Sequence, residues 1–262
     1  MSTIIRQNEL FTLLYRFRFL QRRHFQLLLN HKHVSRIYNW LNQLTQEHYL
    51  KKFFNAHTIT VSASYSLNTK GRKYIKDHLD DREFMSVKEP VLDRVWREYK
   101  YSEQFRNHCL FIADIYVSLY ELVQKTKAVL NFRTKVELLS IKNFIFPAPD
   151  AFFSLEEQDG SKKYFFLEVF DPSTPETRVT RRIKQYFEYC DRRYWQDRSE
   201  GSFPRVVIVL PDVRAKRFTY KQIQRKIAGR EEPIFYLSTW EETRTKGMVK
   251  EVLQRVVAKD SD

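Results

Sequence analysis

Residues 149–171 read PDAFFSLEEQDGSKKYFFLEVFD, and this stretch decides the fold of the C-terminal part of the chain. It holds two apolar runs, and a polar segment typical of a hairpin turn lies between them. Asp150 precedes the first run and Glu168 lies near the end of the second. The pattern predicts two adjacent strands that each carry one carboxylate. Two carboxylates on neighbouring strands can share one divalent cation.

The charge of the chain is strongly uneven. The 262 residues carry a formal net charge of +14. Residues 1–80 contain 13 Lys and Arg against 4 Asp and Glu, so this segment supplies +9 of the excess. An excess of this size is usually retained for a polyanionic partner. We expect that partner to be double-stranded DNA, in preference to an anionic lipid surface.

The composition excludes several classes of protein. Hydrophobic residues make up 42% of the chain and aromatic residues 15%, which indicates a folded globular protein. No apolar run is long enough to span a bilayer, and the first residues lack a secretory signal, so we expect no membrane insertion and a cytoplasmic location. The two cysteines, Cys109 and Cys190, form neither a disulfide framework nor a zinc quartet.

The first 80 residues have the pattern of a winged helix-turn-helix domain. Helical periodicity predicts helices over residues 8–20 and 21–29, and Ser35 is expected to cap a third helix. Two β-branched and aromatic runs follow at 49–54 and 58–67, with a short polar turn between them. Three helices followed by a hairpin form the winged variant of this motif, whose third helix enters the major groove.

This arrangement predicts which side chains meet DNA. Polar residues on the third helix face base edges, and basic residues on the wing face phosphates. The residues expected in these roles are Arg36, Asn39, Asn42 and Gln43 on the helix, with Lys51, Lys52 and His57 on the wing. Winged helices also mediate protein contacts, and that alternative stays open.

Residues 81–100 are rich in charge and are expected to form a connector, and residues 101–262 a second domain. The expected order in that domain is helix 102–125, extended segment 126–140, strands 144–155 and 163–170, helix 175–196, strand 205–210, helix 212–228, strand 234–237 and helix 239–257. Helices that alternate with strands in this way predict an α/β domain with a mixed central sheet. The whole chain is then an α+β protein of two domains.

The order of elements and the two carboxylates resemble the PD-(D/E)xK nuclease core. The resemblance implies that Asp150 and Glu168 hold Mg²⁺ or Mn²⁺. Gln185 and Tyr189 are similar to the Gln-x-x-x-Tyr pair of RecB-like nucleases, and they share one helix face. His108 looks like the additional metal-binding histidine of that branch.

The resemblance departs from the family pattern at one position. The lysine expected two residues after the second carboxylate is Phe170. Lys184 is the candidate that supplies this charge from the following helix. Arg178 and Arg181 are candidates for stabilising the DNA phosphate.

A closer resemblance covers nearly the whole chain. The basic N-terminal module, the His108-x5-Asp114 helix, Pro149-Asp150, Glu168-Val169 and the 184–189 helix look like the replication-relaxation family, which includes MobC-type relaxases of mobilisable plasmids. The resemblance implies metal-dependent nicking of one DNA strand at a transfer or replication origin. Water would act as the nucleophile, and no covalent tyrosine adduct would form.

Two other hypotheses stay open. The first is a DNA-binding accessory or regulatory protein of plasmid replication or mobilisation in which the nuclease fold is catalytically degenerate, and Phe170 favours it. The second is an interaction module that recruits auxiliary mobilisation proteins.

Overall fold

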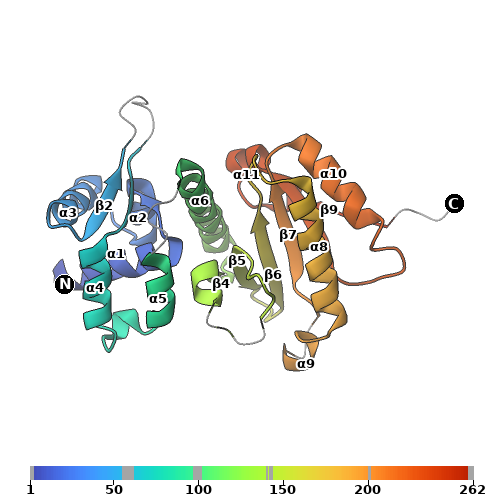
Figure 1. The fold of residues 1–262 in the computed structure, drawn as a ribbon, viewed down its shortest axis with the longest axis horizontal. Coiled ribbons are helices and arrows are strands. Elements are labelled where there is room, and N and C mark those ends of the chain that lie inside the picture. The colour runs from blue at the N-terminus through green and yellow to red at the C-terminus, as the bar shows by residue number, and fades with distance from the viewer. Residues whose placement is uncertain are drawn as a thin grey trace. The chain divides into compact units, whose positions relative to one another are not determined.

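The computed structural model describes residues 3–54, 62–96, 102–139, 141, 144–199 and 202–258. The chain divides into two units, Met1–Val117 and Ser118–Asp262. The division falls inside the long helix α6 (Glu103–Thr126), drawn in green in Figure 1. The expected domain limits at residues 80 and 101 stay a prediction.

The first unit combines helices with a small antiparallel sheet. Its sheet has the order β1–β3–β2, so the strand that comes last in the chain lies in the middle. The elements in chain order are α1 (Thr3–Phe17), β1 (Leu20–Gln21), α2 (Arg22–Leu28), α3 (Val34–Gln46), β2 (Leu50–Phe53), β3 (Ser64–Leu67), α4 (Thr69–Asp77), the 3-10 turn η1 (Arg82–Phe84) and α5 (Glu89–Trp96).

The predicted helices of this unit are present, with shifted ends. The first ends at Phe17, and Arg18 has a positive φ of 70°. Leu20, expected in that helix, pairs with Tyr65 as part of β1. Ser35 is not the cap of the third helix: His33 precedes α3, and no side-chain cap hydrogen bond fixes the start there. The apolar stripe of α3 is buried, with Ile37 and Leu41 fully covered.

The second unit is built on a mixed sheet of six strands among the described residues, with the order β4–β5–β6–β7–β8–β9. The strands β4, β5 and β6 pair antiparallel, β6, β7 and β8 pair parallel, and β9 is antiparallel to β8. The elements are β4 (Val129–Thr134), α7 (Lys135–Leu138), β5 (Ala151–Glu156), β6 (Lys162–Val169), α8 (Glu176–Asp191), α9 (Gln196–Ser199), β7 (Arg205–Leu210), α10 (Val213–Gln224), β8 (Phe235–Thr239), α11 (Trp240–Lys246), the 3-10 turn η3 (Lys250–Val252) and β9 (Gln254–Arg255).

Helices α8 and α10 cover one face of this sheet and supply its apolar core. Ile183 and Tyr186 of α8 pack with Ile223 of α10 against β6, β7 and β8. The strand β7 is apolar after its first residue, Arg205, and its residues from Val206 onward are inaccessible to solvent. A continuous apolar run is what a central parallel strand requires, since both of its faces are buried.

Three predicted elements of this unit need correction. The strand expected over 144–155 starts only at Ala151, because Pro147 and Pro149 lack the N–H groups that a ladder needs. The extended segment 126–140 is the strand β4 followed by the short helix α7. The closing helix expected over 239–257 ends at Lys246.

Gly247 explains that early end. Its φ of 76° lies in the left-handed region, which is common just after a helix and easily adopted only by glycine. After it the chain returns to the sheet as β9. The start of α11 follows the expected boundary, since Thr239 and Glu242 cap it reciprocally. Among the described residues, no helix is long and apolar enough to cross a membrane.

Candidate functional site

The hairpin β5–β6 brings the two predicted carboxylates to the same end of the sheet. Ala151 pairs with Leu167, so Asp150 and Glu168 occupy the next position of the antiparallel register. The backbone N–H of Asp150 donates to the carbonyl of Leu167 at 3.0 Å, which extends the ladder by one residue. Both side chains are buried, with 7% of Asp150 and 6% of Glu168 exposed.

Asp150 completes the ladder of the hairpin with its side chain. Its Oδ2 accepts a hydrogen bond from the backbone N–H of Val169 at 2.9 Å. The carboxylate thus satisfies a donor at a point where β5 has not yet begun. Its Oδ1 lies 3.4 Å from Nζ of Lys135, which comes from α7 and whose backbone N–H donates to the carbonyl of Asp150.

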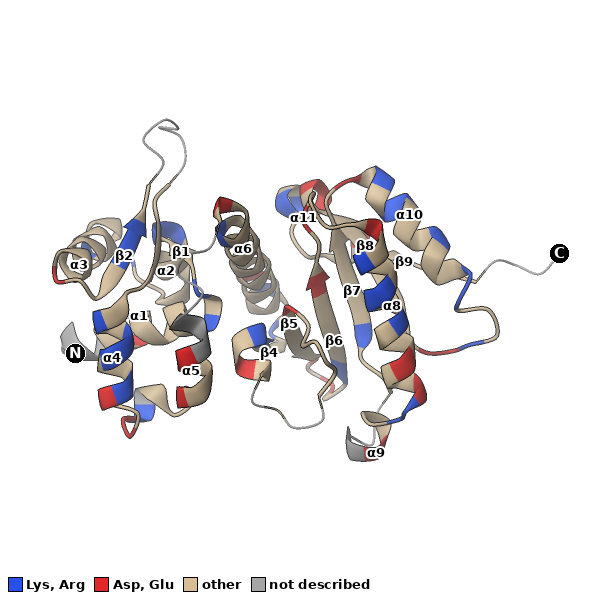
Figure 2. Cartoon of the chain, viewed as in Figure 1, with Lys and Arg blue, Asp and Glu red and all other residues tan. Residues whose placement is uncertain are grey.

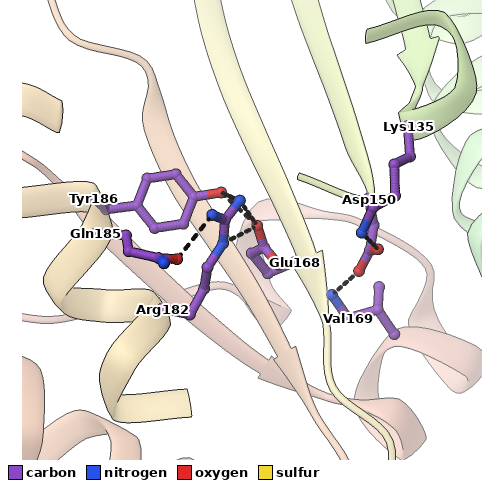
Figure 3. Close-up of polar contacts among 7 residues, drawn as sticks. All are labelled: Lys135, Asp150, Glu168, Val169, Arg182, Gln185 and Tyr186. Atoms are coloured by element: carbon purple, nitrogen blue, oxygen red, sulfur yellow. Dashed lines mark hydrogen bonds and ion pairs between the residues drawn. The ribbon is translucent and has the colours of Figure 1, made fainter. Parts of the chain in front are cut away.

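Glu168 belongs to a buried cluster with two residues of α8. Nε of Arg182 donates to Oε1 of Glu168 at 2.7 Å, and the hydroxyl of Tyr186 donates to the same oxygen at 2.6 Å. Arg182 is only 6% exposed and Tyr186 is fully buried. Figure 3 shows the guanidinium and the phenol meeting the carboxylate from the same side. The guanidinium also lies 4.7 Å from the centre of the Tyr186 ring.

The pKa shifts of Arg182 and Tyr186 agree with a stable ion pair between Arg182 and Glu168. Burial raises the pKa of the Tyr186 phenol well above its ordinary value, and the nearby Glu168 raises it further. Burial alone would lower the pKa of Arg182, but Glu168 and Tyr186 outweigh it and the net shift is upward. Asp150 acts in the same direction on both groups. Arg182 therefore stays charged and Tyr186 stays neutral in the folded protein.

Phe170 stands at the position where the nuclease resemblance leads us to expect a lysine, and its ring belongs to the core. It is 6% exposed and packs in the same cluster as Val179 and Leu210. Its carbonyl accepts a hydrogen bond from the indole of Trp240 at 2.8 Å. A lysine at this position would place an ammonium group among apolar side chains, which is costly without a partner.

These residues, as placed, do not suit a divalent cation. Each carboxylate already has a basic partner, Lys135 for Asp150 and Arg182 for Glu168, so the four formal charges cancel. In the part of the chain that the structure describes, no three His, Cys, Asp or Glu side chains are grouped so that they could hold a metal ion. Mg²⁺ or Mn²⁺ would need Arg182 or Lys135 to leave, and the cation stays a prediction.

The other predicted site residues of α8 lie in different surroundings. Oε1 of Gln185 accepts a hydrogen bond from Nη1 of Arg182 at 3.2 Å, so Gln185 joins the Glu168 cluster. Lys184 is exposed and pairs with Glu188 on the next turn. Tyr189 is buried among aromatic rings that include Phe166 and Phe203.

Arg178 and Arg181 point away from the carboxylates. Both are exposed on the solvent side of α8, opposite the stripe that packs on the sheet. Their side chains form no ion pair or hydrogen bond with any described residue. Their role in contacting a DNA phosphate stays a prediction.

His108 lies on α6 in the first unit, whereas both carboxylates belong to the second. Its ring stacks on Phe105 at 6.4 Å between centroids. Asp114, on the same helix, accepts a hydrogen bond from Nε2 of the buried His24 at 2.7 Å. Nδ1 of His24 in turn accepts the backbone N–H of Gln21. Asp114 thereby anchors the start of α2 and serves the fold of the first unit.

The polar residues predicted to read DNA lie on the accessible face of α3 and on β2. Arg36, Asn39 and Gln43 are exposed, and Asn42 is half-buried. Gln43 donates to Glu47 at 2.9 Å, which occupies its amide. Lys51 and Lys52 are exposed on β2. His57 lies outside the described residues.

Three residues of the carboxylate cluster are absent from the sequence prediction: Arg182, Tyr186 and Lys135. For the first two a signal exists, since Arg182 and Tyr186 fall on the helical stripe with Val179, Ile183 and Cys190. A basic residue on an apolar stripe indicates a buried partner. No comparable signal marks Lys135, which reaches Asp150 only because β4 pairs with β5.

A comparison with known proteins assigns the chain to a family. Residues 11–206 match the family described as Replication-relaxation, which covers most of the chain. The chain therefore belongs to the replication-relaxation family, and this membership suggests a role in plasmid replication or mobilisation. A comparison with curated proteins found no match.

Proposed function

We propose that this member of the replication-relaxation family is a sequence-specific DNA-binding protein of plasmid replication or mobilisation. In this proposal the first unit reads double-stranded DNA, and the carboxylates of the second unit hold the fold together. The observation that carries it is the exposed polar face of α3 beside the lysines of β2, in a segment with a large positive charge.

The topology of the first unit supports this reading. The order α1, β1, α2, α3, β2, β3 and the sheet order β1–β3–β2 are compatible with the winged helix that we propose for this unit. In that fold the helix at the place of α3 enters the major groove, and the hairpin that follows lies along the backbone. Arg36 and Asn39 would then face base edges, with Lys51 and Lys52 against phosphates.

The second unit supports a binding role over a catalytic one. Glu168 has one oxygen shared by Arg182 and Tyr186, and both partners are buried with it. Phe170 fills the place of the family lysine with an apolar ring. A nuclease fold with these features is catalytically degenerate in our proposal.

The test is a selection from a pool of random duplexes by the full-length chain in EDTA. We expect sequencing of the retained DNA to show one enriched motif. Arg36→Ala and Asn39→Ala should each relax the motif at particular positions. Retention of the pool without enrichment would contradict sequence-specific binding.

A second candidate function is metal-dependent nicking of one DNA strand, and the register of β5 and β6 favours it. Asp150 and Glu168 occupy facing positions at one sheet end, as that chemistry requires. The activity would need Arg182 or Lys135 to give way to the cation. A supercoiled plasmid carrying the selected motif would be incubated with the chain and Mg²⁺ or Mn²⁺.

Nicked circles would support this candidate if Asp150→Asn and Glu168→Gln abolish them and Lys125→Gln, on the exposed end of α6, does not. A plasmid that stays supercoiled with either cation would exclude it. Because binding is measured in EDTA, loss of nicking and loss of binding are separate results.

A further inference from the structure

The helix α10 carries a row of basic side chains that the proposed function does not use. Residues 213–230 contain seven Lys and Arg and no Asp or Glu. Six of the seven are exposed, and four of these six follow one another along the helix, at Arg214, Arg217, Lys221 and the C-cap residue Arg225. Such a run is unusual in a unit whose other surface segments mix both signs.

The spacing of these residues places them on one helix face. Steps of three, four and four residues keep successive side chains on the same side of an α-helix. The opposite side is buried, with Thr219 and Ile223 inaccessible to solvent. The row therefore points directly away from the sheet that α10 covers.

The charges of the row are not used inside the protein. Lys216, on the flank of the same helix, forms an ion pair with Glu242, with Nζ of Lys216 3.0 Å from Oε2 of Glu242. Arg230 forms an ion pair with Asp191. The side chains of these four residues make no ion pair or hydrogen bond with any residue that the structure describes. Four uncompensated charges on one face repel each other, and a polyanion relieves that repulsion.

The neighbouring helix extends the positive surface. α8 packs beside α10 on the same face of the sheet, and its outward side carries Arg178 and Arg181. Figure 2 shows blue bands of Lys and Arg along both helices. The surface of α8 is interrupted by Glu188, so α10 is the more uniform of the two.

We propose that the Arg214–Arg217–Lys221–Arg225 row is a second DNA-contacting surface, which binds the phosphate backbone without reading sequence. The inference rests on the proposed DNA-binding function and adds a contact from the second unit. Eleven residues of helix rise about 16 Å, which matches about five phosphates of one strand at about 3.4 Å each along the duplex axis. A single row of basic side chains can therefore follow one strand.

Double-stranded DNA fits this face better than a lipid surface. A membrane-binding helix needs exposed apolar residues that enter the headgroup region. The apolar residues Ala215, Tyr220 and Ile223 of α10 pack into the core of the second unit, and only Val213 at the start of the helix is a strongly exposed apolar residue among the described part of α10. One exposed valine gives too little apolar surface to enter a headgroup region, so charge dominates the outer face.

The experiment measures how the affinity of the full-length chain for a 30-base-pair duplex falls with salt. The test variant replaces the row: Arg214→Gln, Arg217→Gln, Lys221→Gln and Arg225→Gln. The matched control removes four exposed charges scattered elsewhere in the second unit: Lys125→Gln, Arg133→Gln, Lys246→Gln and Arg255→Gln. Both variants lose the same net charge.

Each phosphate contact contributes about 0.9 to the slope of log affinity against log salt, so the test variant should flatten the slope by about 2 to 4. The control should keep the parent slope, and both should keep the preference of the parent for a selected over a scrambled duplex. Equal slopes in the two variants would overturn this inference alone.

Two further outcomes are decisive. A parent that binds no DNA would overturn the proposed function and this inference together. The test variant could also keep the parent slope with DNA and lose binding to phosphatidylserine vesicles. That result would show that the row contacts a lipid surface, and it would overturn the DNA contact.

Discussion

The charged residues of the two predicted sites differ in their exposure to solvent and in their ion pairing. On α3 and β2 of the first unit, Arg36 and Lys52 are exposed to solvent. At the end of β5 and β6 in the second unit, Asp150 and Glu168 are buried and paired with Lys135 and Arg182. Both regions are dense in polar residues, and the sequence alone marks both as sites.

This difference in exposure indicates which of the two regions a ligand can reach. An exposed charge interacts weakly with its neighbours and loses little when it turns to a partner molecule. A buried pair is different, since removing one member leaves an uncompensated charge in a medium of low polarity. The first region is accessible to the DNA that we propose as its ligand, and the second is accessible to a cation only at the expense of the fold.

The largest expected effect comes from breaking the buried pair. Arg182→Met should destabilise the second unit by about 3–5 kcal/mol, because Glu168 would stay buried with only the Tyr186 hydroxyl. Urea unfolding followed by fluorescence would measure this loss. Lys184→Met, an exposed position on the same helix, should leave the unfolding midpoint unchanged.

A contrary result would be informative about the metal. If Arg182→Met keeps the stability of the parent and gains Mn²⁺ binding by calorimetry, Arg182 occupies a cation site. The buried cluster would then have a latent catalytic role.

The next effect concerns Tyr186 and has a defined pH dependence. Tyr186→Phe should cost about 1.5–3 kcal/mol at neutral pH, because a hydrogen bond to a charged oxygen is lost. The folded pKa of this phenol lies well above the value of 10.0 that applies to the unfolded chain. Below pH 10 the phenol is neutral in both states, so its contribution to stability is fully present. Above pH 10 the unfolded phenol ionises first and that contribution falls.

Urea unfolding at intervals between pH 8 and pH 11 would test the direction of this pH dependence. The difference in stability between the parent and Tyr186→Phe should shrink as the pH rises above 10. A difference that grows over this range would place the tyrosine outside the Glu168 cluster.

On the exposed side of the comparison, single substitutions should change specificity and leave the fold intact. Arg36→Ala or Asn39→Ala should lower the preference for the selected duplex by about 1–3 kcal/mol each, if each makes a base contact. Competition binding with selected and scrambled duplexes would measure it. An equal loss for both duplexes would show that the residue meets phosphate only.

The smallest expected effect belongs to the β2 lysines. Lys51→Gln and Lys52→Gln should each flatten the salt dependence of binding by about 0.9, with the preference between duplexes unchanged. Titrations between 50 and 300 mM salt would show it. A change in sequence preference would show that these lysines contact bases and not the phosphate backbone.

Much of the fold could be predicted from periodicity. The hairpin of the second unit follows from its two apolar runs, and the α8 stripe from Val179, Ile183, Tyr186 and Cys190. The elements that were missed depend on single residues. Gly247 ends α11 early, and Pro147 and Pro149 delay the start of β5, so the chain forms β9 and a shorter strand than expected.

The candidate site was predictable in its carboxylates and not in their partners. Asp150 and Glu168 stand out because charged residues border apolar strands. Three arginines in one helix, at positions 178, 181 and 182, compete for the role of partner, and only the one on the apolar stripe is buried. Lys135 depends on the pairing of β4 with β5, a contact between distant segments that local pattern does not encode.

The most direct test is the affinity of the full-length chain for its selected duplex and for a scrambled one, each measured in EDTA and again in Mn²⁺. The account predicts that the selected duplex binds at least about a thousandfold more tightly and that the cation does not change this ratio. Equal affinity for the two duplexes, or a preference that appears only with Mn²⁺, would contradict it.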